Sequence, residues 1–397
     1  MEVPKKNLLQ VIRPNDVSSD EDAKAINQGL DEPLGGESVE SLFEGEVLVI
    51  VNDGTRPTPT ASVLQELEKR VDLDRAQFLI ATGAHRAPTE DEFGLIFGKM
   101  LDRLRPRIHV HDSHRSKTEY VGRSRNGTEI WVNEMVTRFD RILIITSVEP
   151  HYFAGYTGGR KSILPGVCAF STIEENHSLA MRPASKVLAL DGNPVHEDMM
   201  DCAKELKGRR IVGIQVVLDR HQMVHKVAVG ELHASFERAV GWANQVYVVP
   251  IKRKADVVMT IAPYPMDVDL YQSQKAMENA KYALKDGGTL ILVSKCRHGI
   301  GEGPFYEALR SLGDPEKVKR DMVLEYQLGD HKAVRMAEIA KRSRICGVTS
   351  LEPKELEQIN IHPFESAQAA LDDALASDPK ASVIVIYEGS VVVPKVS

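Results

Sequence analysis

The chain has 397 residues, of which 42% are hydrophobic and 27% charged, so a globular protein of two domains is expected. Its formal net charge of −7 argues against a nucleic-acid-binding surface, which needs a basic face. No apolar run long enough to span a membrane is present, and the first ten residues lack the apolar core of a secretory signal. The four cysteines form neither a zinc motif nor a disulfide framework, which favours the cytoplasm.

The first half of the chain predicts buried strands, each followed by a polar loop. Residues 1–46 are expected to form an ordered extension with a short helix over 23–30. The apolar run 47–51 predicts a strand buried on both faces. The loop 52–59 follows it and precedes a helix. It contains Arg56, whose guanidinium can bind a carboxylate through two parallel hydrogen bonds. Helix capping alone explains this loop equally well.

A second predicted strand, 78–82, ends just before His85 and Arg86, and a helix is predicted over 89–104. A histidine at the end of a strand is more often structural than catalytic. Arg86 either orders the loop or binds phosphate, and the sequence does not separate these interpretations.

Three further histidines lie close together in the sequence. His109 and His111 share one face of a predicted strand because side chains alternate along a strand, and His114 follows. They predict a metal-dependent hydrolase as an alternative, although no carboxylate stands at the spacing of a metal ligand.

The segment from Glu149 to His177 follows a strand predicted over 142–146 and is the richest in functional residue types. Its glycines permit positive φ angles and a close approach to a ligand. Residues 155–162 nearly match a P-loop, but Arg160 replaces the second glycine and Pro165 interrupts the helix that a P-loop requires. A surface turn with a solvated Arg160–Lys161 pair is the simplest alternative.

The second half again alternates strands and helices, with strands predicted over 257–261, 289–293 and 382–387. We therefore predict an α/β fold with two α/β domains, over residues 1–250 and 251–397, and an active site in the interdomain cleft. A helix in the second domain carries Tyr271, Gln272 and Lys275 at spacings that let all three face that cleft.

Three separated motifs resemble the lactate racemase family, the enzymes that use a nickel-pincer nucleotide. The first is the spacing of His151, Lys161 and His177, and the other two are Asp-x-Thr-Arg-Pro from Asp53 and Tyr-Gln-x-x-Lys from Tyr271. The separation of His85 from His151 also matches the family's pair of catalytic bases. The resemblance covers most of the chain, from about Asp53 to Lys275.

The resemblance implies a role for each of these residues. His85 and His151 would be the catalytic bases, Lys161 would carry the cofactor through a thioamide, and His177 would be a nickel ligand. Other residues would contact the cofactor phosphate or the substrate: Asp53 and Thr55 for the cofactor, and Arg56, Tyr271, Gln272 and Lys275 for the substrate.

The implied reaction is racemisation or epimerisation of a 2-hydroxy acid, in which a hydride leaves the substrate carbon and returns to either face. It needs a base on each side of a planar intermediate, and we expect loops after neighbouring strands to place His85 and His151 in this way. The implied partners are the small-molecule substrate and the enzymes that synthesise the cofactor. Besides the hydrolase, a non-catalytic nucleotide-binding protein and an NAD-dependent hydroxy-acid dehydrogenase remain alternatives, although the dinucleotide fingerprint G-x-G-x-x-G is absent.

Overall fold

The computed structural model describes residues 1–301, 303–311 and 326–397 and divides into two compact units. The central unit is Asp16–Val246, and the terminal unit combines Met1–Asn15 with Tyr247–Ser397. The chain thus changes unit four residues before the predicted boundary at 250. The prediction of one domain over residues 1–250 also differs from the structure in its first 15 residues, which join the terminal unit.

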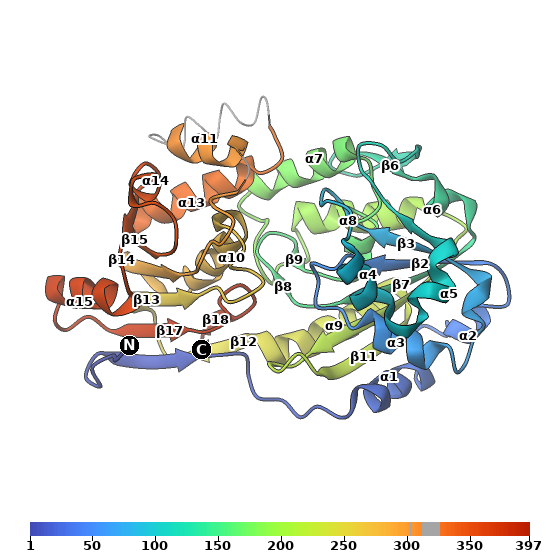
Figure 1. Ribbon diagram of the computed structural model, residues 1–397, viewed down its shortest axis with the longest axis horizontal. Coiled ribbons are helices and arrows are strands. Elements are labelled where there is room, and N and C mark those ends of the chain that lie inside the picture. Colours follow the sequence, from blue (N-terminus) through green and yellow to red (C-terminus); the bar gives the residue numbers. More distant parts are fainter. Residues whose placement is uncertain (302, 312–325) are drawn as a thin grey trace. The chain divides into compact units, whose positions relative to one another are not determined.

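The central unit is built on a six-stranded sheet in the order β11-β10-β7-β2-β3-β4 (Figure 1). All neighbouring pairs are parallel except β10 and β11, which are antiparallel. Its strands are β2 (Val47–Asn52), β3 (Ala76–Ala81), β4 (Ile108–Val110), β7 (Arg141–Ser147), β10 (Arg210–Leu218) and β11 (Val224–Glu231). Two small antiparallel pairs accompany it, β5 (Thr118–Arg123) with β6 (Glu129–Asn133) and β8 (Pro150–His151) with β9 (Gly155–Tyr156).

The predicted central strands are confirmed, and their burial explains why their sequences are continuous apolar runs. Every side chain from Val47 to Val51 is fully buried, as are those from Ile142 to Ile145. A strand covered on both faces cannot alternate polar and apolar residues, because either face would then bury polar groups. These two strands pair directly in parallel register, from Leu48 with Ile142 to Val51 with Ile145.

Helices connect the strands of the central unit. They are α1 (Asp22–Asp31), α2 (Val39–Leu42), α3 (Thr60–Leu67), α4 (Glu90–Phe97), α5 (Leu101–Leu104), α6 (Glu134–Arg138), α7 (Phe170–Ser178), α8 (Pro194–Glu205) and α9 (Leu232–Tyr247), the last of which reaches the unit boundary. The helix predicted over 89–104 is divided into α4 and α5. Gly98 has a positive φ of 55°, a conformation that ends a helix.

The terminal unit has its own six-stranded sheet, in the order β1-β17-β13-β14-β15-β16, and every neighbouring pair is parallel. Its strands are β1 (Leu8–Ile12), β13 (Ala255–Ile261), β14 (Leu284–Val293), β15 (Arg344–Val348), β16 (Ile361–Pro363) and β17 (Val383–Ile386), with a separate parallel pair β12 (Val248–Ile251) and β18 (Val393–Val396). Its described helices include α10 (Leu270–Ala280), α11 (Gly303–Ser311), α13 (Asp330–Arg342), α14 (Pro353–Glu357) and α15 (Ala367–Ser377). The predicted α/β class is therefore confirmed for both units.

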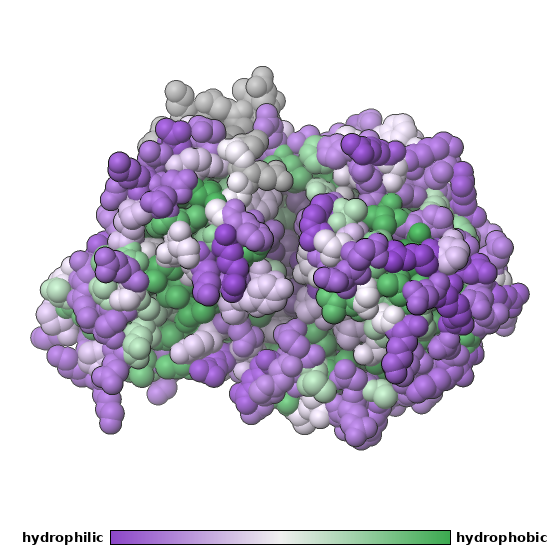
Figure 2. Space-filling view, in the orientation of Figure 1, coloured by the Kyte–Doolittle hydropathy of each residue, from purple (hydrophilic) through white to green (hydrophobic). Residues whose placement is uncertain are grey.

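Hydrophilic residues cover much of the molecular face shown in Figure 2, with smaller hydrophobic patches between them. Of the helices that the structure describes, none is both long and apolar enough to cross a membrane.

Candidate functional site

The predicted catalytic loops leave the same edge of the central sheet. Asp53 follows β2, His85 follows β3 and His151 lies just after β7, and these parallel strands are adjacent in the order β7-β2-β3. The expectation that the two histidines follow neighbouring strands was wrong, because β2 lies between their strands. Adjacent strands are about 4.8 Å apart, so β3 and β7 are separated by ~10 Å. The loops that carry His85 and His151 therefore lie on either side of the loop after β2.

His85 is held by a carboxylate. Its Nδ1 lies 2.8 Å from Oδ2 of Asp53, whose side chain is only 4% exposed, whereas the His85 side chain is 40% exposed. Burial opposes ionisation of Asp53, but the hydrogen bond and charge of His85, the charge of Arg56 and a hydrogen bond from Thr55 outweigh it. Together they hold the pKa of Asp53 below its ordinary value. The ionised Asp53 accepts a hydrogen bond from the Nδ1–H of His85, which leaves Nε2 as the atom that can exchange a proton with a ligand.

Of the other polar residues of these loops, Thr55 and Arg86 bond through their side chains to neighbouring carboxylates, whereas Arg56 is partly exposed. The Thr55 hydroxyl donates to Oδ1 of Asp53 at 2.6 Å, so it orders the carboxylate. Arg86 donates to both carboxylate oxygens of Glu92, at 2.7 and 2.9 Å, and Glu92 also completes the capping box of α4. The structure therefore supports the ordering role for Arg86. Arg56 is partly exposed, and its backbone N–H donates to the Asp53 carbonyl at 3.2 Å.

His151, Lys161 and His177 meet around the ring of Phe153. The His151 ring contacts the Phe153 ring edge-on with centroids 4.6 Å apart, and the His177 ring does so at 5.1 Å. The Lys161 ammonium lies 5.5 Å from the centroid of the same ring and 3.5 Å from Nε2 of His151. His151 is only 8% exposed, and its Nδ1 accepts from the Ala154 N–H at 3.3 Å. The predicted base, attachment lysine and metal ligand are thus gathered in one place.

Arg160 is the buried centre of this loop, so the alternative of a surface turn with a solvated Arg160–Lys161 pair is wrong for this residue. It is 1% exposed, and its guanidinium donates to four loop carbonyls, those of Ala154, Tyr156, Thr157 and Gly158, at 2.8 to 3.3 Å. Its Nε donates to Nδ1 of His196 at 3.0 Å, and it lies 4.1 Å from the centroid of the Phe236 ring. Burial lowers the pKa of Arg160 to about 9, which still leaves it charged at neutral pH.

The glycines of the loop serve its folding. Gly155, Gly158 and Gly159 have positive φ angles of 77°, 86° and 50°, as their sequence context predicts. A Cβ at Gly155 would lie 2.2 Å from the Ala189 carbonyl oxygen, and one at Gly158 would lie 2.5 Å from Val148. The close approach at these glycines is therefore to other parts of the protein, and the expectation that it is to a ligand is not supported. The segment 159–162 forms a 3-10 turn with no α-helix directly after it, which agrees with the exclusion of a P-loop.

The three histidines of the alternative metal site are separated by their contacts. His111 is buried, bonds to the Cys168 carbonyl at 2.8 Å and to the Asn133 amide at 3.1 Å, and its pKa is lowered by burial. His109 bonds to the Gln77 side chain, and His114 stacks on Phe170. Within the described part of the chain, no group of three histidine, cysteine or acidic residues is arranged to hold a metal ion. The hydrolase prediction therefore has no support in the structure. The proposed nickel site is not tested by this result, because it uses one protein ligand.

The remaining predicted site residues lie on α10 of the terminal unit. Tyr271, Gln272 and Lys275 are partly exposed, whereas Ser273, Gln274 and the residues from Ala276 to Ala280 are buried, so the three share the open face of the helix. The Lys332 ammonium lies 3.3 Å from the centroid of the Tyr271 ring and donates to the Tyr271 carbonyl at 2.6 Å. Phe305 contacts the same ring edge-on at 5.1 Å. The sequence did not predict this contact, because Lys332 lies far from Tyr271 along the chain and belongs to no recognised motif.

The fold and the motifs on it are those of an isomerase of the racemase class. Residues 1–187 match the model of the lactate racemase N-terminal domain, and residues 251–393 match that of the lactate racemase C-terminal domain. Together these matches cover most of the chain, which belongs to the lactate racemase family.

Named relatives and solved structures agree with this assignment. The lactate racemase of Thermoanaerobacterium thermosaccharolyticum is 32% identical over 303 residues, covering 74% of this chain and 70% of that protein. The lactate racemase of Lactiplantibacillus plantarum is 28% identical over 387 residues, covering 94% and 91%. The apoprotein structure from the first organism superposes with a TM-score of 0.90 at 26% identity, over 100% of this chain and 97% of that one. A structure from Thermotoga maritima, with a TM-score of 0.72 at 18% identity over 96% and 100%, shares the fold.

Proposed function

We propose that this enzyme racemises a 2-hydroxy acid, with lactate as the first candidate substrate, and that it uses a nickel-pincer nucleotide bound to Lys161. The observation that carries the proposal is the meeting of Lys161, His151 and His177 around the Phe153 ring. The residues fit the group: a primary amine is available for covalent attachment, and an imidazole suits nickel(II). When bound, this cofactor supplies a hydride acceptor, and the protein supplies position and charge.

In this proposal the histidines move the proton of the substrate hydroxyl. Asp53 fixes Nδ1 of His85, and the Ala154 N–H fixes Nδ1 of His151, so both rings present Nε2. Nε2 of one ring accepts the hydroxyl proton of one enantiomer, and Nε2 of the other ring returns a proton on the opposite side. The Ala154 N–H favours the neutral His151 tautomer with its proton on Nε2, so His151 must give up this 3.3 Å hydrogen bond and carry a proton on Nδ1 when it accepts a proton at Nε2. Since imidazole titrates near neutrality, each ring can begin as a base and finish as an acid.

Other residues would hold the substrate still. Arg56 is proposed to bind the carboxylate, helped by Lys275, with Tyr271 and Gln272 lining the substrate pocket. Asp53 and Thr55 are proposed to lie beside the cofactor phosphate as part of the loop that begins the anion-binding end of α3. Asp53 is an acceptor for His85, so its side chain would act on the substrate through that histidine.

The test uses protein produced together with the cofactor-synthesis enzymes. Intact mass, nickel content and peptide mapping should place one adduct on the peptide that contains Lys161, and Lys161→Ala should lack it. The loaded protein should interconvert the enantiomers of lactate or of another member of a 2-hydroxy acid panel. An adduct on Lys275, zinc in place of nickel, or turnover that requires added NAD would each overturn the proposal.

A further inference from the structure

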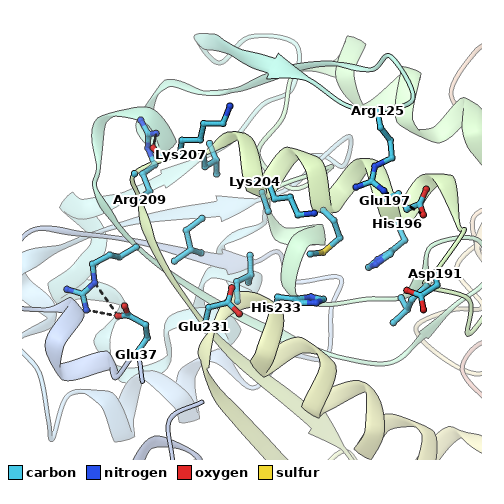
Figure 3. Close-up of a pocket in the computed structure, with 18 residues that line it drawn as sticks. Glu37, Arg125, Asp191, His196, Glu197, Lys204, Lys207, Arg209, Glu231 and His233 are labelled. Carbon is cyan, nitrogen blue, oxygen red and sulfur yellow. Dashed lines mark hydrogen bonds and ion pairs between the residues drawn. The ribbon is translucent and has the colours of Figure 1, made fainter. Parts of the chain in front are cut away.

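A pocket of about 760 Å³ lies in the central unit and contains none of the residues assigned above to catalysis, cofactor or substrate (Figure 3). It is formed by α8, the start of β10 and the junction of β11 with α9, together with Arg125 of the β5–β6 hairpin. His196 of α8 lines it and is 7% exposed. The same His196 accepts the hydrogen bond from Arg160, the buried centre of the catalytic loop. The side chain of His196 therefore connects the pocket with Arg160.

Several cations surround His196, and two of them are paired within the protein: Arg125 with Asp201 at 2.7 Å, and His233 with Glu237 at 3.3 Å. Burial is the main cause that lowers the pKa of His196 to about 3, and the charges that add to it are all cationic, from Arg160, His233, Arg125 and Lys204. The side chains of Arg125, His196, Lys204 and His233 extend toward a common space in Figure 3. Since Nδ1 of the neutral His196 accepts from Arg160, its proton is on Nε2, which can donate to an anion.

Most of the acidic residues that line the pocket accept hydrogen bonds from other residues of the protein. Glu37 accepts from Arg210 at 2.6 Å, Glu197 accepts from the Gly192 N–H at 3.2 Å, and Glu231 accepts from the Ala234 N–H at 2.8 Å. Lys204 forms no ion pair with any residue in the described part of the chain. Asp191 is exposed and is the remaining carboxylate of the lining.

We propose that this pocket binds a small organic anion with two or three carboxylates, held by Lys204 and the Nε2–H of His196. A carboxylate suits planar donors such as imidazole and guanidinium, and the volume exceeds that needed for a single inorganic anion. Binding acts on the catalytic loop, because an anion that fixes His196 also fixes the acceptor of Arg160, and Arg160 holds four carbonyls of that loop. The binding itself does not depend on the racemase reaction proposed above.

Citrate and inorganic phosphate are the probes, compared by calorimetry at constant ionic strength. We expect saturable binding of one citrate per chain and weaker binding of phosphate. Lys204→Gln should weaken citrate binding about tenfold, as expected for one charged hydrogen bond, and Asp191→Asn should strengthen it by removing a like charge. Arg56→Gln is the matched control for citrate binding at the proposed substrate site and should leave the affinity unchanged.

The coupling is read by amide hydrogen exchange of residues 154–160, which citrate should slow in the wild type and not in Lys204→Gln at the same citrate concentration. No saturable binding, tighter binding of phosphate than of citrate, or a loss of binding in Arg56→Gln alone would overturn the site. Citrate binding with unchanged exchange in this loop would overturn the coupling. A protein that binds citrate but fails to racemise would contradict only the proposed function.

Discussion

The two histidines proposed as bases are held in opposite ways. His151 is buried on a loop whose backbone carbonyls converge on Arg160, and its own Nδ1 accepts from a backbone N–H. His85 has a side chain that is 40% exposed, and one carboxylate, Asp53, orients it. The folding of a whole loop therefore sets the position of His151, whereas a single ion pair sets the position of His85. Changes around His151 should affect stability and activity together, whereas changes around His85 should affect activity more than stability.

The largest expected effect is the loss of either histidine. His85→Ala and His151→Ala should each lower racemisation by about 10²- to 10⁴-fold, the usual contribution of a general acid or base. Both should retain nickel, measured on loaded protein. Near-normal racemisation in either variant, across a panel of 2-hydroxy acids, would show that the two-histidine mechanism does not operate.

The second effect tests the loop of His151. Arg160→Lys keeps the charge but loses most of the hydrogen bonds to loop carbonyls, so the free energy of unfolding should fall by about 2–4 kcal/mol. The measurement is denaturant unfolding. Arg86→Lys is the matched control on the other loop: its side chain is 62% exposed and pairs with Glu92, so the loss should stay below ~1 kcal/mol. Equal losses of unfolding free energy in both variants would show that Arg160 does not stabilise its loop more than Arg86 stabilises the other.

The third effect tests the orientation of His85 by Asp53. Asp53→Asn replaces a charged acceptor with a neutral one and should slow racemisation about tenfold, which corresponds to ~1.4 kcal/mol. The loop of His151 should be unaffected, as judged by amide exchange of residues 154–160. If exchange there rises as much as activity falls, the two loops are not independent.

A fourth prediction concerns acid. Burial opposes ionisation of Asp53, but its hydrogen bonds and cationic neighbours lower its pKa below the ordinary value of 3.8. Its contribution to stability is therefore complete above that ordinary value and is lost as the pH falls through the lower, folded-state pKa. The difference in unfolding free energy between the wild type and Asp53→Asn should be constant near neutrality and shrink below about pH 4. A difference that grows on acidification would contradict the direction of this pKa shift.

The smallest expected effect lies outside both loops. His109→Gln changes an exposed side chain that bonds to Gln77, so stability should change by less than ~0.5 kcal/mol, with no change in nickel content or racemisation rate. A loss of bound metal in this variant would revive the hydrolase alternative.

Sequence patterns predicted the parts of this fold whose residues act locally. The apolar runs of β2 and β7 predict fully buried strands because both of their faces are covered. The fate of the Arg160–Lys161 pair could not be predicted in the same way. The folded chain places different groups beside these adjacent cations: Phe236 and His196 beside Arg160, and His151 and Phe153 beside Lys161.

The sequence patterns did not predict the strand order of the central sheet either. β7 pairs with β2 across nearly a hundred residues of intervening sequence, and this pairing is what places the loops of His151 and His85 on either side of Asp53. The three motif residues His151, Lys161 and His177 nevertheless lie together in the central unit. Their chemical roles rest on the resemblance and stay predictions.

The first strand of the chain has a consequence for biosynthesis. β1 belongs to the terminal sheet and pairs with β17, and the side chain of Asn7 just before it bonds to the Ala381 carbonyl across 374 positions. During synthesis, β1 therefore leaves the ribosome long before its partner β17 has been made. The strands of the central unit, in contrast, all lie within one contiguous stretch of the chain, Asp16–Val246. The central unit can fold during synthesis, and the terminal sheet is completed only when nearly the whole chain has emerged.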